Sequence, residues 1–136
     1  MAGEKGPAVF FDTGTEISNA NSLVKTERSR KEIEVNVTSI DDFAEERSLS
    51  IDCMKIDVEG AELDVLRGAK QTFLRSRPVV RLGLHPPFIA QNQQTLEEIW
   101  EVITSYQLTV EFGGSKVGKT WFCSQTDLFD VNLLPS

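Results

Sequence analysis

The sequence predicts an α/β fold whose sheet mixes parallel and antiparallel strands. An apolar segment at 51–57 is followed by an amphipathic helix and a second apolar segment at 79–84. This β–α–β order predicts a parallel pair of strands joined by a crossover. Two further strand-like segments surround a glycine-rich turn near the C-terminus, which indicates an antiparallel hairpin. At 136 residues, the chain is long enough for one domain, predicted to span 1–136.

The N-terminal part predicts two strands. Residues 8–11 are strand-like, and residues 12–15 supply turn formers. Residues 18–32 are polar and charged, which indicates a loop. Residues 32–37 alternate apolar and polar side chains, as expected for a strand with one wet face.

The first two helices are predicted from capping and periodicity. Ser39 precedes two aspartates, so we expect it to cap a short helix at 40–47. After Gly60, a broad apolar stripe predicts one longer helix, which ends at Arg77 before a proline.

The C-terminal third predicts a helix and a hairpin. Thr95 and Glu98 form a capping box before an amphipathic helix at 96–103. Strands are predicted at 108–112 and 120–123. Residues 113–119 join these two predicted strands, and Thr120 begins the second. Together, residues 113–120 match the phosphate-loop pattern G-x-x-x-x-G-K-[ST]. That motif needs a helix after it, and a strand is predicted here, so the pattern favours a glycine-rich hairpin turn.

Composition and charge exclude several classes of function. The formal net charge of −7 argues against nucleic acid and anionic membranes as partners. No apolar stretch is long enough to span a membrane, and the N-terminus does not resemble a signal peptide, so we expect a cytoplasmic protein. Cys53 and Cys123 lie inside strand-like segments without metal-ligand spacing, and we expect reduced thiols.

Acidic residues follow the predicted strand at 51–57. Open α/β sheets bind their ligands at the carboxyl ends of their strands, where Asp57 and Glu59 are placed. If the strand geometry continues through them, both carboxylates point to the same side. Such a pair can hold a cation, bind a ligand amine or hydroxyl, or share a proton. Glu59 alternatively only caps the following helix.

Two basic side chains are predicted at the same edge. Lys55 lies two residues before Asp57 and is expected on the same face, either as its salt-bridge partner or facing a ligand. His85 is the only histidine and ends the second parallel strand. A histidine there can act as a general base or ligate a metal, although a structural role is equally open.

The core of this region resembles a known family. Residues 55–63, KIDVEGAEL, followed by VLRGA at 65–69, resemble the FkbM family of methyltransferases. Residues 37–43 are similar to the threonine–leucine–aspartate segment that precedes the same strand in the family. Residues 78–80 and His85 resemble the family strand that ends in glutamate–x–histidine. The resemblance covers residues 6–87.

The resemblance implies a partial Rossmann-like methyltransferase sheet and methyl transfer from S-adenosylmethionine to a hydroxyl of a small molecule or sugar. Asp57 and Glu59 would then bind the cofactor, and His85, with Asp57 and Lys55, would form the catalytic set. His85 would deprotonate the acceptor. Such a transfer depends on the alignment of nucleophile, methyl carbon and leaving sulfur.

Two departures from the family pattern define the alternatives. The family's glutamate is replaced by Gly83, and no glycine-rich cofactor turn is found before Ala8. The chain therefore resembles the C-terminal half of such a domain, and we expect it to be inactive and not to bind S-adenosylmethionine alone. One alternative is a non-enzymatic α/β module that forms homo-oligomers through an exposed sheet edge. Another is a metal site built from Asp57, Glu59 and His85.

Overall fold

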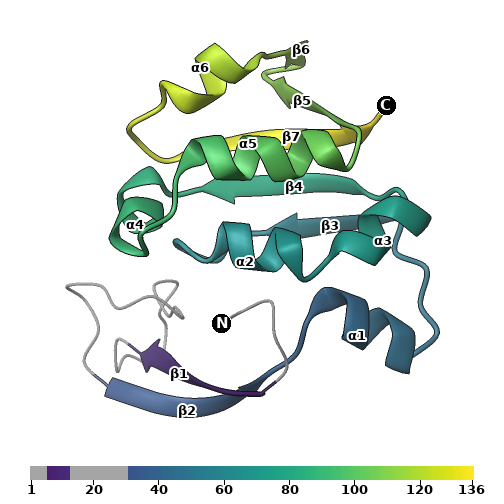
Figure 1. The fold of residues 1–136 in the computed structure, drawn as a ribbon, viewed down its shortest axis with the longest axis vertical. Coiled ribbons are helices and arrows are strands. Elements are labelled where there is room, and N and C mark those ends of the chain that lie inside the picture. The colour runs from purple at the N-terminus through teal and green to yellow at the C-terminus, as the bar shows by residue number, and fades with distance from the viewer. Residues whose placement is uncertain (1–5, 13–30) are drawn as a thin grey trace.

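The computed structural model describes residues 6–12 and 31–136. Two strands, β1 (Gly6–Asp12) and β2 (Lys31–Val37), pair antiparallel as a separate sheet (Figure 1). Both confirm strands predicted from the sequence. The turn was predicted at 12–15, but Asp12 belongs to β1. Residues 13–15 of that turn and most of the predicted loop, 18–30, lie outside the described residues.

The larger sheet is mixed, as predicted. Its strands are β3 (Cys53–Ile56), β4 (Val79–Leu84), β7 (Phe129–Pro135), β5 (Leu108–Phe112) and β6 (Ser115–Lys116), in that spatial order. The strands β3 and β4 are parallel, whereas β7 runs antiparallel to both of its neighbours, β4 and β5. The strand β5 therefore runs in the same direction as β4.

Six helices connect the described strands. They are α1 (Ile40–Glu46), α2 (Glu62–Arg67), α3 (Lys70–Arg75), α4 (Pro86–Gln91), α5 (Leu96–Ser105) and α6 (Lys119–Cys123). Figure 1 shows α2, α3 and α5 on one side of the five-stranded sheet. The buried core lies between these helices and the sheet, where Leu63, Leu82 and Ile99 are fully buried. None of the described helices has the length and apolar character needed to cross a lipid bilayer.

The predicted caps are confirmed. The Ser39 hydroxyl accepts a hydrogen bond from the backbone N–H of Asp42 at 3.0 Å. Thr95 and Glu98 form the complete capping box, in which each side chain bonds to the backbone of the other residue. Both caps satisfy N–H groups that a helix start leaves without a partner.

The single helix predicted after Gly60 is wrong in one respect, because it is divided into α2 and α3 at Gly68. The side chain of Asp41 caps the second helix. Its carboxylate accepts hydrogen bonds from the backbone N–H groups of Gln71 and Thr72 at 2.9 and 2.8 Å. A tertiary contact from α1 thus begins a new helix where the local periodicity predicted a continuous one.

The predicted strand at 120–123 is wrong, because these residues belong to α6. Phe122 is fully buried and packs against Trp100 of α5 and Phe129 of β7. The place beside β5 is taken instead by the short β6 and by β7, which the sequence analysis did not predict. The glycine-rich turn itself is confirmed, since Gly113 and Gly114 have positive φ angles between β5 and β6.

The structure shows that the phosphate-loop pattern lacks the local geometry of a phosphate cradle. A helix does follow the pattern, contrary to our expectation, but α6 has five residues. The glycines at the start of the pattern form a hairpin turn rather than a loop that leads directly into that helix. A phosphate cradle needs the strand, the glycine-rich loop and the helix N-terminus in succession.

Candidate active site

His85 lies where the parallel strand β4 ends and the helix α4 begins. Pro86 and Pro87 occupy the first positions of α4, where proline's missing N–H costs no hydrogen bond. The imidazole stacks against Phe88, with 6.0 Å between ring centroids. His85 is 7% exposed, so its environment is set by the protein groups around it.

Glu62 is the partner of His85 that the sequence analysis missed. Its side chain is fully buried, and its Oε1 lies 2.8 Å from His85 Nδ1. The same oxygen accepts a hydrogen bond from the backbone N–H of Gly60 at 3.1 Å. Its other oxygen, Oε2, is buried with no hydrogen-bond partner among the described residues.

A signal for Glu62 was present in the sequence. Val65, Leu66 and Ala69 follow it at spacings of three, four and seven residues, so it lies on the apolar stripe of its helix. An acidic residue near a helix N-terminus is also explained by a favourable interaction with the helix dipole, which hides this signal. Because a carboxylate on a buried stripe is costly without a partner, it indicates a buried hydrogen-bonded pair.

Asp57 approaches His85 from the end of β3. Its Oδ1 lies 3.5 Å from His85 Nε2, and its Oδ2 lies 3.0 Å from Lys55 Nζ. The Asp57 and Lys55 side chains are 44% and 69% exposed. The structure thus brings Asp57 and His85 together as predicted, and Lys55 adopts the salt-bridge position rather than one next to the imidazole.

The strand geometry does not continue to Glu59, so the argument that alternation aligns it with Asp57 is wrong. The strand β3 ends at Ile56, shorter than the predicted 51–57, and Glu59 has a φ of 49°. Gly60 follows with a φ of 105°, and a Cβ there would lie 2.9 Å from the backbone of Phe88. The close packing of this turn against α4 redirects the chain after Asp57.

The carboxylates around His85 make it a stronger base than a free imidazole. The hydrogen bond to Glu62 is the largest influence and raises the pKa of His85 above its ordinary value. Burial opposes this effect, while the negative charges of Glu62, Asp57 and Glu59 add to it. The raised pKa of His85 means that the imidazolium form is stabilised here.

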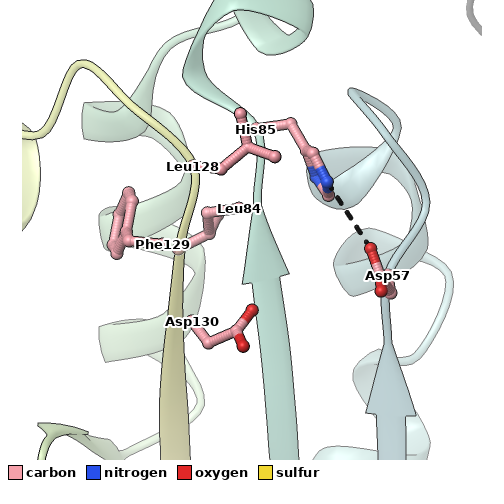
Figure 2. A pocket seen from close by; sticks show the side chains of 6 residues that line it. All are labelled: Asp57, Leu84, His85, Leu128, Phe129 and Asp130. Carbon is pink, nitrogen blue, oxygen red and sulfur yellow. Dashed lines mark ion pairs between the residues drawn. The ribbon is translucent and has the colours of Figure 1, made fainter.

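A pocket of about 360 Å³ opens at this edge of the sheet (Figure 2). Its lining combines Asp57 and His85 with residues from the ends of β4 and β7, namely Leu84, Leu128, Phe129 and Asp130. The volume is at the low end of those typical for small-molecule sites. Acidic oxygens, one imidazole and apolar walls suit a small ligand that donates hydrogen bonds.

The alternative of a metal site is not supported by this arrangement. Within residues 6–12 and 31–136, no three side chains of histidine, cysteine, aspartate or glutamate lie together in a way that could hold a metal ion. His85 uses one ring nitrogen for Glu62, which leaves one for Asp57 or a ligand.

Comparisons with known proteins agree with the family resemblance. Residues 2–110 match the family described as the methyltransferase FkbM domain. A protein described as the 2-O-methyltransferase NoeI, from Sinorhizobium fredii (strain NBRC 101917 / NGR234), is 32% identical over 81 residues. These residues make up 59% of this chain and 33% of that protein, so the match spans about a third of the relative's length. No solved structure gives a significant match.

Proposed function

The chain belongs to the FkbM methyltransferase family, and we propose that it carries the acceptor-activating part of an S-adenosylmethionine-dependent methyltransferase that acts on a hydroxyl group. The observation that carries this proposal is the buried pair of Glu62 and His85 beside an acidic pocket. The printed activity of the relative from Sinorhizobium fredii, a 2-O-methyltransferase, supports an oxygen atom as the acceptor.

In this proposal, Glu62 is a positioning residue and His85 is the base. Glu62 accepts the hydrogen bond from Nδ1–H, which leaves the lone pair of His85 Nε2 available to an acceptor hydroxyl. When the hydroxyl oxygen forms its bond to the methyl carbon and the bond from that carbon to the cofactor sulfur breaks, the hydroxyl proton would move to Nε2. The resulting imidazolium lies between the carboxylates of Glu62 and Asp57, which stabilise its charge.

The residues at this edge fit one side of the cofactor. S-adenosylmethionine supplies an electrophilic methyl group, and the partly exposed Asp57 side chain offers it a hydrogen-bond acceptor at this edge. We assign cofactor contacts to Asp57 and Glu59, as the family resemblance implies. A volume of about 360 Å³ is small for cofactor and acceptor together, so we place the acceptor in the pocket and the remaining cofactor contacts outside it.

The test is methyl transfer from labelled S-adenosylmethionine to hydroxyl acceptors, measured on the natural gene product that carries this chain. Replacing His85 with glutamine should lower kcat by about 10²-fold or more, which is the usual contribution of a general base. Glu62→Gln tests the positioning role of Glu62, and Glu101→Gln is its matched control, because the carboxylate of Glu101 is exposed on α5. Glu62→Gln should lower kcat and move the acid limb of the pH profile to lower pH, whereas Glu101→Gln should change neither. An undiminished rate in His85→Gln would refute the proposal.

An oligomerising role remains the second candidate, because β3 forms one edge of the five-stranded sheet and, among the described residues, pairs with β4 alone. An unpaired strand edge favours pairing with another copy of the chain. Light scattering over a range of protein concentrations tests this candidate, and a monomer at all concentrations would contradict it.

A further inference from the structure

Gly83 lies between two aspartates from neighbouring strands. It pairs with Asp130 of β7, and Asp57 directly follows Ile56, which pairs with Leu82 on the other side of β4. Figure 2 shows Asp57 and Asp130 on opposite sides of β4, with Asp130 directed toward that strand. Both aspartates line the pocket that contains His85.

Each aspartate holds one oxygen toward a cation and the other toward Gly83. Asp57 Oδ2 bonds to Lys55 at 3.0 Å, and Asp130 Oδ2 bonds to Arg81 at 2.9 Å. The two Oδ1 atoms lie 3.3 and 3.2 Å from the position that a Cβ at residue 83 would occupy. The absence of a side chain at Gly83 therefore leaves a gap between two oriented carboxylate oxygens.

The chemistry of this gap favours an uncharged ligand with hydrogen-bond donors. Both facing oxygens are acceptors, so a carboxylate or phosphate group would be repelled. Lys55 and Arg81 already balance the two negative charges, which reduces the attraction for a cationic amine. Leu128 and Phe129 add an apolar wall on one side. A hydroxyl group on a carbon skeleton meets all three conditions.

We propose that Gly83 opens a subsite in which Asp130 Oδ1 accepts the hydrogen bond that a second hydroxyl of the acceptor donates, next to the hydroxyl that His85 activates. This inference rests on the proposed function and specifies its acceptor as a molecule with hydroxyls on adjacent carbons. Asp57 Oδ1 lies 3.5 Å from His85 Nε2 and also faces the gap at Gly83. The site of the activated hydroxyl and the subsite for the second hydroxyl are therefore adjacent. In relatives with glutamate at this position, the longer side chain would occupy the subsite.

Binding of small probes to the full 136-residue chain tests the subsite without the cofactor. Amide NMR titrations would compare cis-1,2-cyclohexanediol with cyclohexanol, which lacks the second hydroxyl. We expect the diol to shift the signals of Gly83, Asp130 and His85 and to bind about tenfold more tightly, as one hydrogen bond to a charged group predicts. Equal affinity for the two probes would overturn the proposal.

Three variants locate the effect. Gly83→Glu should abolish the preference for the diol, and Asp130→Asn should reduce it. Gly83→Ala provides a milder change, because the facing carboxylates are ends of exposed side chains that can shift by the few tenths of an ångström required. Glu111→Gln, a carboxylate on the neighbouring strand β5 outside the pocket, is the matched control and should bind like the wild type. A full diol preference in Gly83→Glu, or its loss in Glu111→Gln, would overturn the subsite.

The subsite and the proposed function fail in distinguishable ways. Methyl transfer that depends on His85 but proceeds equally well on acceptors with a single hydroxyl would overturn the subsite alone. Selective diol binding that depends on Gly83 and Asp130 supports the subsite, even if the natural gene product transfers no methyl group, and in that case the proposed function fails.

Discussion

Replacing His85 with phenylalanine should strongly destabilise the folded chain, because it leaves a buried carboxylate without its main partner. Phenylalanine keeps an aromatic ring of similar shape that can still stack against Phe88. It cannot donate the 2.8 Å hydrogen bond to Glu62. The Glu62 side chain is fully buried and would retain one donor, the backbone N–H of Gly60.

The expected loss is about 3–5 kcal/mol, the usual cost of removing one partner of a buried ionic pair. For a chain of this size, that loss corresponds to a decrease in Tm of roughly 10–20 °C. In a Glu62→Gln background, the same replacement should cost about 1–3 kcal/mol, because a neutral amide is less costly to bury without a partner than a charge. The difference between the two backgrounds is the coupling energy of the pair.

Urea denaturation followed by circular dichroism at neutral pH would measure all four members of this double-mutant cycle. Asp130→Asn is the control, because it breaks an ion pair with Arg81 in which both side chains are about half exposed. Such pairs contribute about 0–1 kcal/mol. A cost below about 1 kcal/mol for His85→Phe, or equal costs in both backgrounds, would refute our account of Glu62 as a buried charged partner.

The pH dependence of stability provides a second prediction. Because the pKa of His85 is raised in the folded state, its stabilising contribution is fully present below the ordinary value of 6.5 and is lost as the pH rises through the raised value. The urea midpoint should fall with rising pH in the wild type and fall less in Glu62→Gln. An equal dependence of the midpoint on pH in both proteins would contradict the role assigned to the pair of Glu62 and His85. Third, Gly60→Ala should destabilise the chain by about 2 kcal/mol or more, because its φ of 105° is strained for alanine and the new Cβ meets Phe88. Thermal melts would compare this variant with Gly113→Asn. Gly113 has a φ of 57° and no atom within 4 Å of its Cβ position, so asparagine should be tolerated there. Similar melting temperatures for the two variants would contradict this reasoning.

Local sequence patterns determined most of the parallel half of the sheet. The segment at 79–84 was predicted with the bounds that the structure has, because a mostly apolar run is followed by His85 and two prolines. The capping box at Thr95 was predictable for a similar reason, since both of its partners lie within three residues. The meeting of Asp57 with His85 followed from one topological rule, that parallel strands end at the same edge.

Long-range packing decided the C-terminal third. The segment 120–123 has β-favouring residues, yet it is helical because Phe122 must reach the core between α5 and β7. In the last strand, β7, buried positions alternate with less buried ones, but its sequence alone does not indicate that it inserts between β4 and β5. Its place in the sheet brings Asp130 to the pocket, so this residue could not be predicted as part of the site.

The sequence by itself determined that Asp57 and His85 stand at the carboxyl edge, because strand ends and prolines are set by neighbours along the chain. The tertiary structure alone decided how these groups are paired. Glu62 becomes the partner of His85, 23 positions away, because the first residue of α2 lies beside the end of β4. Gly83 becomes a gap because two strands from distant parts of the chain place aspartates on either side of it. Hydrogen bonds and burial act over a few ångströms in space, and separation along the chain does not report that distance.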